Sequence, residues 1–237
     1  MGLFDRSIKV SASGLFNGRT DWHCHILPGV DDGFKRMDDS LAALVLYEQA
    51  GIKEVWLTPH IMEDIPNRTS ALRERFVDLT LAYTGPIRLH LASENMMDAL
   101  FEQRLLAGDL LPLKDKRLLV ETSYFQPPID LRGTLERIKE AGYTPILAHP
   151  ERYRYMNDSD YEYLVSKNIK LQLNIVSLAG GYGKPAQEKA QMLLSKGYYN
   201  FFGSDLHFLP HFMQAINSKA VKKEYATLLP NIQNTLV

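Results

Sequence analysis

Two histidines separated by one residue, His23 and His25, stand in the segment DWHCHILPGVDDG. Side chains alternate between the two faces of an extended segment, so both imidazoles would point one way and Cys24 the other. Two imidazoles on one face can bind the same cation, because a neutral imidazole nitrogen is a common metal ligand. The spacing therefore predicts a metal site that includes His23 and His25.

Further residues able to bind metal stand at the ends of short β-prone runs. They are His60, Glu94, Glu121, His149, Asp205 and His207, and Asn174 closes one more run. In a parallel barrel the C-terminal ends of the strands share one mouth, where barrel enzymes place their chemistry. We therefore expect these residues to converge in one pocket, with Asp32 reaching over it from the loop after His25. Glu121 follows an apolar run, where a metal ion or a pair with Arg152 would offset the cost of a buried carboxylate.

The elements that would position these residues alternate between two periodicities. Strands are expected at 20–23, 53–58, 87–93, 117–121, 144–148, 169–174 and 199–203, and helices at 38–50, 69–83, 96–107, 130–141, 158–167 and 185–196. Such alternation indicates a parallel sheet with crossover helices. Seven strand–helix units favour a closed or nearly closed (β/α) barrel, with a doubly wound open sheet as the alternative. We expect one domain over residues 19–237, including a C-terminal helix, after an N-terminal extension at 1–18.

Composition narrows the class of protein. The net charge of −1 and the absence of a basic run argue against a nucleic-acid partner. The longest apolar stretch, 41–47, is too short to span a bilayer, and the first residues lack the apolar core of a secretory signal. A single cysteine fits a reducing compartment. We therefore expect a cytoplasmic protein without membrane insertion; its oligomeric state is left open.

Taken together, DWHCHILPGVDDG, TPH, the acidic residue after LHLAS, LVETSYF, LAHPERY and GSDLH resemble the PHP (polymerase and histidinol phosphatase) superfamily. Within it they are similar to the manganese-dependent protein-tyrosine phosphatases of bacterial capsule and exopolysaccharide loci. The resemblance runs from about Thr20 to His207. It implies a distorted seven-stranded (β/α) barrel that holds three divalent ions, with Mn²⁺ as first choice and Fe²⁺ or Zn²⁺ as alternatives.

The resemblance also implies roles for individual residues. One ion would be held by His23, His25, Glu94 and Asp205, a second by Glu94, Glu121 and His149, and a third by Asp32, His60 and His207. Arg152 would bind the substrate phosphate. From its place before the first histidine, Asp21 is expected to serve in catalysis by orienting a ligand imidazole, with a turn residue as the alternative. Asp31 is expected to be solvated. His90 is expected to pack or lie on the surface, outside the site.

The predicted reaction is the hydrolysis of a phosphomonoester by metal-activated water. Four carboxylates against three divalent ions leave a surplus of about +2, which suits a phosphate dianion. By resemblance the substrate is the phosphotyrosine tail of a tyrosine autokinase in exopolysaccharide biosynthesis. A cysteine mechanism is disfavoured, because the position six residues after Cys24, where that mechanism requires arginine, is Val30.

One departure from the family weakens the tyrosine preference. The related enzymes carry an arginine shortly after the last metal histidine, whereas this chain reads Phe208-Leu209-Pro210-His211-Phe212. His211 is a candidate replacement. The alternatives are a small-molecule phosphatase of the histidinol-phosphate type, a C–N hydrolase of the amidohydrolase type and an inactive PHP scaffold.

Overall fold

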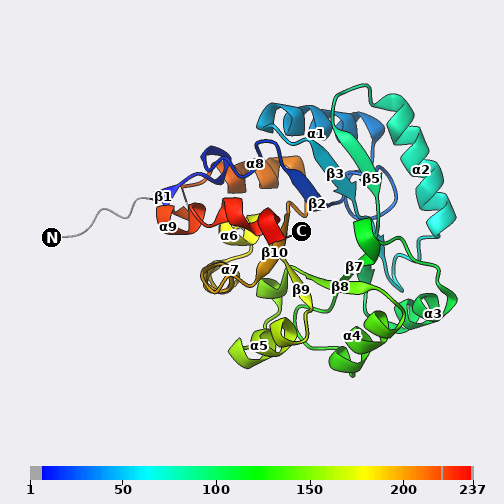
Figure 1. Cartoon of the computed structure of the whole chain (residues 1–237). Helices are drawn as coiled ribbons and strands as arrows, with labels where there is room; N and C mark the ends of the chain where they lie inside the picture. The colour runs from blue at the N-terminus through cyan, green and yellow to red at the C-terminus, as the bar shows by residue number, and fades with distance from the viewer. Residues whose placement is uncertain (1–6, 220, 236–237) are drawn as a thin grey trace.

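Parallel strands surrounded by helices make up the fold of this chain, whose structure is a computed structural model describing residues 7–219 and 221–235 (Figure 1). Three strands form one sheet in the order β2-β3-β5: β2 (Thr20–Cys24), β3 (Glu54–Leu57) and β5 (Arg88–Leu91). Six form a second sheet in the order β10-β9-β8-β7-β6-β4: β4 (His60–Ile61), β6 (Glu94–Met96), β7 (Arg117–Glu121), β8 (Thr144–Ala148), β9 (Lys170–Asn174) and β10 (Tyr199–Gly203). Every pairing within these two sheets is parallel, as expected of an α/β domain.

The two sheets are not closed into the single seven-stranded barrel that the sequence suggested. All seven predicted strand runs contain a strand, but two of these strands stop early. The chain leaves β3 at Leu57, passes Thr58 and Pro59, and enters the second sheet as β4. It likewise leaves β5 at Leu91 and re-enters as β6. Proline lacks the N–H that a continuous ladder needs, which accounts for the first break.

Backbone hydrogen bonds join the sheets where their ends approach. The N–H of Asp205 donates to the carbonyl of His23 (2.8 Å), and the N–H of His25 donates to the carbonyl of Leu206 (3.0 Å). These bonds hold the end of β2 against the segment that follows β10. The first histidine pair and the GSDLH segment are thereby neighbours, although about 180 residues separate them in sequence.

The predicted helices are found within a few residues of the expected positions. They are α1 (Met37–Ala50), α2 (Thr69–Ala82), α3 (Ala99–Ala107), α4 (Leu131–Glu140), α5 (Asp158–Ser166) and α7 (Lys184–Ser195). Short-range chemistry sets their ends: Asp98 accepts from the N–H of Phe101 at the start of α3, and Gly108 ends it in the left-handed conformation. The α3 start therefore falls later than predicted, because residues 94–96 form β6.

Smaller elements complete the described chain. They are β1 (Ser7–Ile8), β11 (Val221–Lys222), α6 (Ile175–Leu178), α8 (Leu209–Asn217), α9 (Lys223–Ala226), and the 3₁₀ helices η1 (Val10–Ala12), η2 (Lys114–Lys116), η3 (Pro150–Arg152) and η4 (Leu229–Thr235). β1 pairs antiparallel with β11. Within the predicted extension, Val10, Leu15 and Phe16 are buried in the main core. None of the helices in the described ranges combines the length and apolar character that crossing a bilayer requires.

Candidate metal centre

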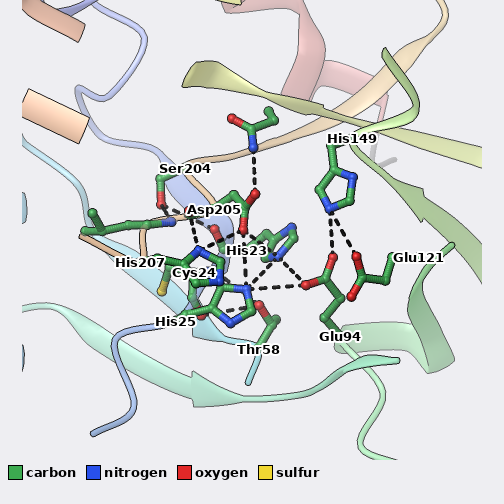
Figure 2. Close-up of polar contacts among 12 residues, drawn as sticks. His23, Cys24, His25, Thr58, Glu94, Glu121, His149, Ser204, Asp205 and His207 are labelled. Atoms are coloured by element: carbon green, nitrogen blue, oxygen red, sulfur yellow. Dashed lines mark hydrogen bonds and ion pairs between the residues drawn. The ribbon is translucent and has the colours of Figure 1, made fainter. Parts of the chain in front are cut away.

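The two histidines of β2 and the residue after it meet two carboxylates at a fully buried point. His23 Nε2 lies 3.0 Å from His25 Nε2, 3.1 Å from Glu94 Oε2 and 3.4 Å from Asp205 Oδ1. His25 Nε2 lies 3.3 Å and 3.4 Å from the same two oxygens. Figure 2 shows both imidazoles turned toward these carboxylates. The four groups have the arrangement of a shared metal site.

A second group adjoins the first through Glu94. His60 Nδ1 lies 3.2 Å from Glu94 Oε2 and 3.0 Å from Glu121 Oε1. The imidazole of His149 points at both carboxylates (Figure 2), with Nε2 3.0 Å from Glu94 Oε1 and 3.8 Å from Glu121 Oε2. Glu94 thus stands between the two groups, in position to serve both.

A third group lies at the open side of the cluster. Oδ1 of Asp32 is 3.6 Å from His60 Nε2 and 3.3 Å from His207 Nε2, and the His25 ring stacks on His207 at 3.8 Å. The Asp32 side chain is 66% exposed, whereas His25 is fully buried. With this group, the structure brings all nine residues of the predicted ligand set to one place.

Five buried atoms of the cluster residues form no hydrogen bond in the described part of the protein: His60 Nδ1, Glu94 Oε2, Glu121 Oε1, His149 Nδ1 and Asp205 Oδ1. All but His149 Nδ1 lie within 3.4 Å of another ligand atom of the cluster. Leaving buried polar atoms without a partner is costly, and native proteins do so rarely. Bound cations would satisfy these four atoms. Imidazole and carboxylate donors suit Mn²⁺, Fe²⁺ and Zn²⁺ alike, so the residues fit divalent metal without choosing among these ions.

The charges of the cluster also favour cations. Burial alone would lower the pKa of the His23 imidazolium, but the carboxylates of Glu94 and Asp205 raise it to about 9. Burial would raise the pKa of the Glu94 carboxyl, yet the imidazoles of His23 and His60 hold it well below its ordinary value. The cluster therefore binds positive charge strongly, and protons and metal ions compete for the same atoms.

Hydrogen bonds to the other ring nitrogens orient the two β2-end imidazoles. Gln172 Oε1 lies 3.0 Å from His23 Nδ1, and Asp31 Oδ2 lies 2.8 Å from His25 Nδ1, so both Nε2 atoms face the cluster. The expectation that Asp31 is solvated was wrong. Its carboxylate is buried and also accepts from the N–H groups of Gly33 and His60, because the loop folds back under the site.

Asp21 does not contact an imidazole, contrary to one of its predicted roles. Its buried carboxylate accepts from the N–H groups of His23 (3.2 Å) and Ser204 (2.9 Å) and from the hydroxyl of Tyr47 (2.8 Å). These bonds tie β2 to the turn that precedes Asp205. Asp21 thus positions backbone at the base of the cluster, and its part in catalysis stays a prediction.

Unusual backbone places two members of the cluster. His149 and Asp205 both have positive φ, 32° and 50°, directly after β8 and near the end of β10. Such conformations are strained for residues other than glycine and collect at functional sites. Close packing adds to this: a Cβ on Gly203 would lie 2.5 Å from the Cβ of His23 and 2.6 Å from Nε2 of Gln172. Only glycine allows that approach.

A cavity of about 320 Å³ opens beside the cluster, and Arg152 forms part of its wall. The guanidinium donates from Nη1 to Asp205 Oδ2 (2.9 Å) and lies between the rings of Tyr124 and Tyr182, 4.1 Å and 3.9 Å from their centroids. His211 and Phe208 line the same cavity. The predicted alternative pair between Glu121 and Arg152 is not seen among the described residues. The neighbouring Glu151 accepts from the Asn174 N–H and the Tyr199 hydroxyl.

Sequence reasoning missed Gln172, Tyr182 and the orienting role of Asp31. Gln172 lies within β9, and the sequence around it does not indicate that its side chain contacts His23. Tyr182 lies between α6 and α7, in a segment without a periodic pattern. Asn174 does reach the site, donating to Asp205 Oδ2 (2.7 Å).

Two residues lie outside the cluster as predicted. His90 stacks on Trp56 with the ring centroids 4.6 Å apart. Cys24 is fully buried, and burial raises the pKa of its thiol well above the ordinary value. A protonated, inaccessible thiol cannot serve as a nucleophile.

Comparison with known proteins agrees with this geometry. A family model described as "Capsular polysaccharide synthesis, CpsB/CapC" matches residues 19–228. The chain is 30% identical over 221 residues to tyrosine-protein phosphatase YwqE of Bacillus subtilis (strain 168), covering 89% of this chain and 86% of that protein. It is 27% identical over 226 residues to tyrosine-protein phosphatase CpsB of Streptococcus pneumoniae, covering 86% and 90% of the two chains.

A solved structure shows the same likeness in three dimensions. It belongs to a study of YwqE from Bacillus subtilis and CpsB from Streptococcus pneumoniae, described there as unique metal-dependent tyrosine phosphatases. The TM-score is 0.70 at 26% sequence identity, and the match covers 91% of this chain and 87% of the other.

Proposed function

The chain belongs to the CpsB/CapC family, and from that premise we propose that it is a metal-dependent protein-tyrosine phosphatase, a hydrolase of phosphoric monoesters. The observation that carries the proposal is the set of buried carboxylate and imidazole atoms that form no hydrogen bond with the described residues, placed beside a cavity that Arg152 lines. A cation-binding cluster next to a guanidinium suits a phosphate ester better than an uncharged substrate.

The cluster would hold three divalent ions, with Mn²⁺ as first choice. The proposed ligands are His23, His25, Glu94 and Asp205 for one ion, Glu94, Glu121 and His149 for the second, and Asp32, His60 and His207 for the third. Bound cations of this kind stabilise phosphoryl charge as Lewis acids and lower the pKa of water. His25 and His60 approach neighbouring groups as well, which supports a shared cluster of ions rather than separate sites.

The surrounding residues would hold the substrate. Arg152 presents a planar guanidinium that can donate two parallel hydrogen bonds to phosphate oxygens. The rings of Tyr124 and Tyr182 and the bond to Asp205 hold that plane in place. The aromatic side chains of Tyr182 and Phe208 in the cavity wall offer surfaces for a phenyl ring. His211, in the same wall, would take over part of the phosphate binding that the missing arginine provides in the relatives.

The physiological substrate would be the phosphotyrosine tail of a protein kinase of capsule or exopolysaccharide synthesis. The family description supports the pathway, and the names of the relatives support the phosphotyrosine chemistry. A kinase substrate of this kind would place the reaction in the cytoplasm. The strands around the cluster would form the distorted (β/α) barrel that the resemblance implies, with the joint between β2 and the end of β10 as its seam.

Removal and restoration of metal tests the proposal. The protein is stripped with a chelator and assayed with a phosphotyrosine peptide, a phosphoserine peptide, a generic aryl phosphate and histidinol phosphate. Mn²⁺, Fe²⁺, Co²⁺ or Zn²⁺ is then added back separately. We expect no turnover without metal and the highest kcat/KM for the phosphotyrosine peptide after addition of metal. Faster hydrolysis of histidinol phosphate, or no response to any cation, would contradict the proposal.

A further inference from the structure

A second, larger cavity of about 600 Å³ adjoins the first across Arg152. The side chains of Tyr124, Arg152 and Tyr182 line both cavities, so the stacked guanidinium forms the partition between them. Among the other lining residues are Phe125, Arg154 and Lys189. A chain whose phosphorylated side chain entered the first cavity would therefore pass directly over the second.

The second cavity carries positive charge. Arg154 is exposed, its guanidinium lies 4.8 Å from the centroid of the Phe125 ring, and no ion pair involves it among the described residues. The single acidic lining residue, Glu151, is 1% exposed, and both its oxygens accept hydrogen bonds from within the protein. The unpaired charge in this cavity is therefore positive and would attract an anion.

An exposed apolar side chain borders the same cavity. Phe125 lines it and is 68% exposed; Ile129, in the same loop between β7 and α4, is fully exposed but lines another cavity. Exposed large apolar groups beside a polar cleft are typical of surfaces that bind another chain. The loop that carries them begins directly after Glu121, a member of the metal cluster. The substrate's own polypeptide is the ligand that this position fits.

We propose that the second cavity binds the polypeptide flanking the phosphotyrosine and that Arg154 selects an acidic side chain within two positions of it. This inference rests on the proposed phosphatase function. Arg152 and Arg154 are two residues apart, so their Cα atoms are separated by at most about 7 Å, the span of two residues of an extended substrate. A phosphate at Arg152 and a carboxylate one or two residues away can therefore reach the two guanidinium groups together.

The test compares two phosphotyrosine peptides on the metal-loaded protein, one with aspartate at the two positions on each side and one with asparagine there. The measured quantity is the ratio of their kcat/KM values. We expect the unaltered protein to favour the acidic peptide by about fivefold, which corresponds to an exposed ion pair, and the preference to weaken as salt is added. Arg154→Gln should abolish the preference, and Arg154→Glu should invert it.

Arg132→Glu is the matched control. Arg132 also stacks on an aromatic ring, 4.1 Å from the centroid of Tyr163, and it does not line the second cavity. The same change of charge at that position should leave the ratio unaltered. Equal hydrolysis of both peptides, or a preference that survives Arg154→Glu, overturns the anion-binding subsite alone. Hydrolysis of neither peptide with any of the four cations overturns the proposed function and the subsite with it.

Discussion

The Glu94 carboxylate illustrates how much of the centre rests on single side chains. Its Oε2 lies 3.1 Å, 3.3 Å and 3.2 Å from imidazole nitrogens of His23, His25 and His60, and it forms no hydrogen bond in the described structure. One oxygen thus faces three rings from two segments of the chain, the end of β2 and β4. A ligand shared between two ions would occupy this position.

Replacing that carboxylate by an amide should remove metal and activity together. We expect Glu94→Gln to lower both the bound metal, measured by elemental analysis, and kcat for an aryl phosphate, the latter by about a hundredfold or more. The amide is close to isosteric, so the fold should persist, as circular dichroism would verify. Full metal content with full activity in this variant would refute the bridging role.

Arg152 should respond to substitution in a different way. Lysine keeps the charge but loses the planar fork that fits between Tyr124 and Tyr182. We expect Arg152→Lys to reduce kcat/KM for a phosphotyrosine peptide by about a hundredfold while the metal content stays unchanged. Arg132→Lys serves as the matched control. Unaltered kcat/KM would show that the phosphate is bound elsewhere.

At the residue level, the sequence predicted the members of the cluster but not the groups that orient them. Histidines and acids at strand ends are visible because their spacing follows the period of the backbone. The choice between Asp31 and Asp32 was half wrong, since both contribute: Asp32 faces the open side, and Asp31 holds His25 from beneath. Whether Asp31 or Asp32 turns inward depends on how the loop folds back, and no sequence pattern predicts the fold of this loop.

At the level of elements, the sequence indicated where strands occur but not where they change sheet. Residues 53–58 and 87–93 looked like uninterrupted strands, whereas each ends early and a short strand of the second sheet follows. β4 and β6 have two and three residues, too few to show a periodicity. Their register nevertheless pairs His60 with Glu94, which puts both into the cluster.

The end of β10 is sensitive to added volume. Gly203→Ala would force a Cβ against His23 and Gln172, so we expect it to lower the free energy of unfolding by about 1–3 kcal/mol and to weaken metal binding. Gly108→Ala is the comparison, because its φ of 69° also disfavours alanine but open space surrounds it. That variant should lose stability without losing metal affinity. Equal metal affinity in both variants would argue against a positioning role for the β10 end.

For the whole molecule, the alternating α/β order was predictable because each helix and strand has its own periodicity and end signals. The way in which the strands close against one another was not predictable from the sequence. It depends on long-range register, and the described structure joins its two sheets through a few backbone bonds between the end of β2 and the segment after β10. Nothing local in the chain encodes those contacts.

Stability should fall with rising pH in the metal-free protein but not in the metal-loaded protein. In the metal-free protein the pKa of His23 is raised from 6.5 to about 9, so its proton stabilises the fold fully below pH 6.5, and this contribution is lost as the pH rises through 9. We expect the Tm of chelated protein to fall between pH 6.5 and 8.5. The Tm of metal-loaded protein should not fall, because the cation replaces the proton. A rise in Tm for the chelated protein over this range would contradict the assignment.

The ion pair between Arg152 and Asp205 ties two binding events together. One oxygen of the Asp205 carboxylate faces the cluster, and the other accepts from the Arg152 guanidinium. A cation bound at the first oxygen would withdraw negative charge from the carboxylate and so weaken its ion pair with Arg152. Cation occupancy and oxyanion affinity then become thermodynamically reciprocal: each must change the other by the same factor. The supply of metal would therefore change the protein's affinity for phosphate as well as its turnover.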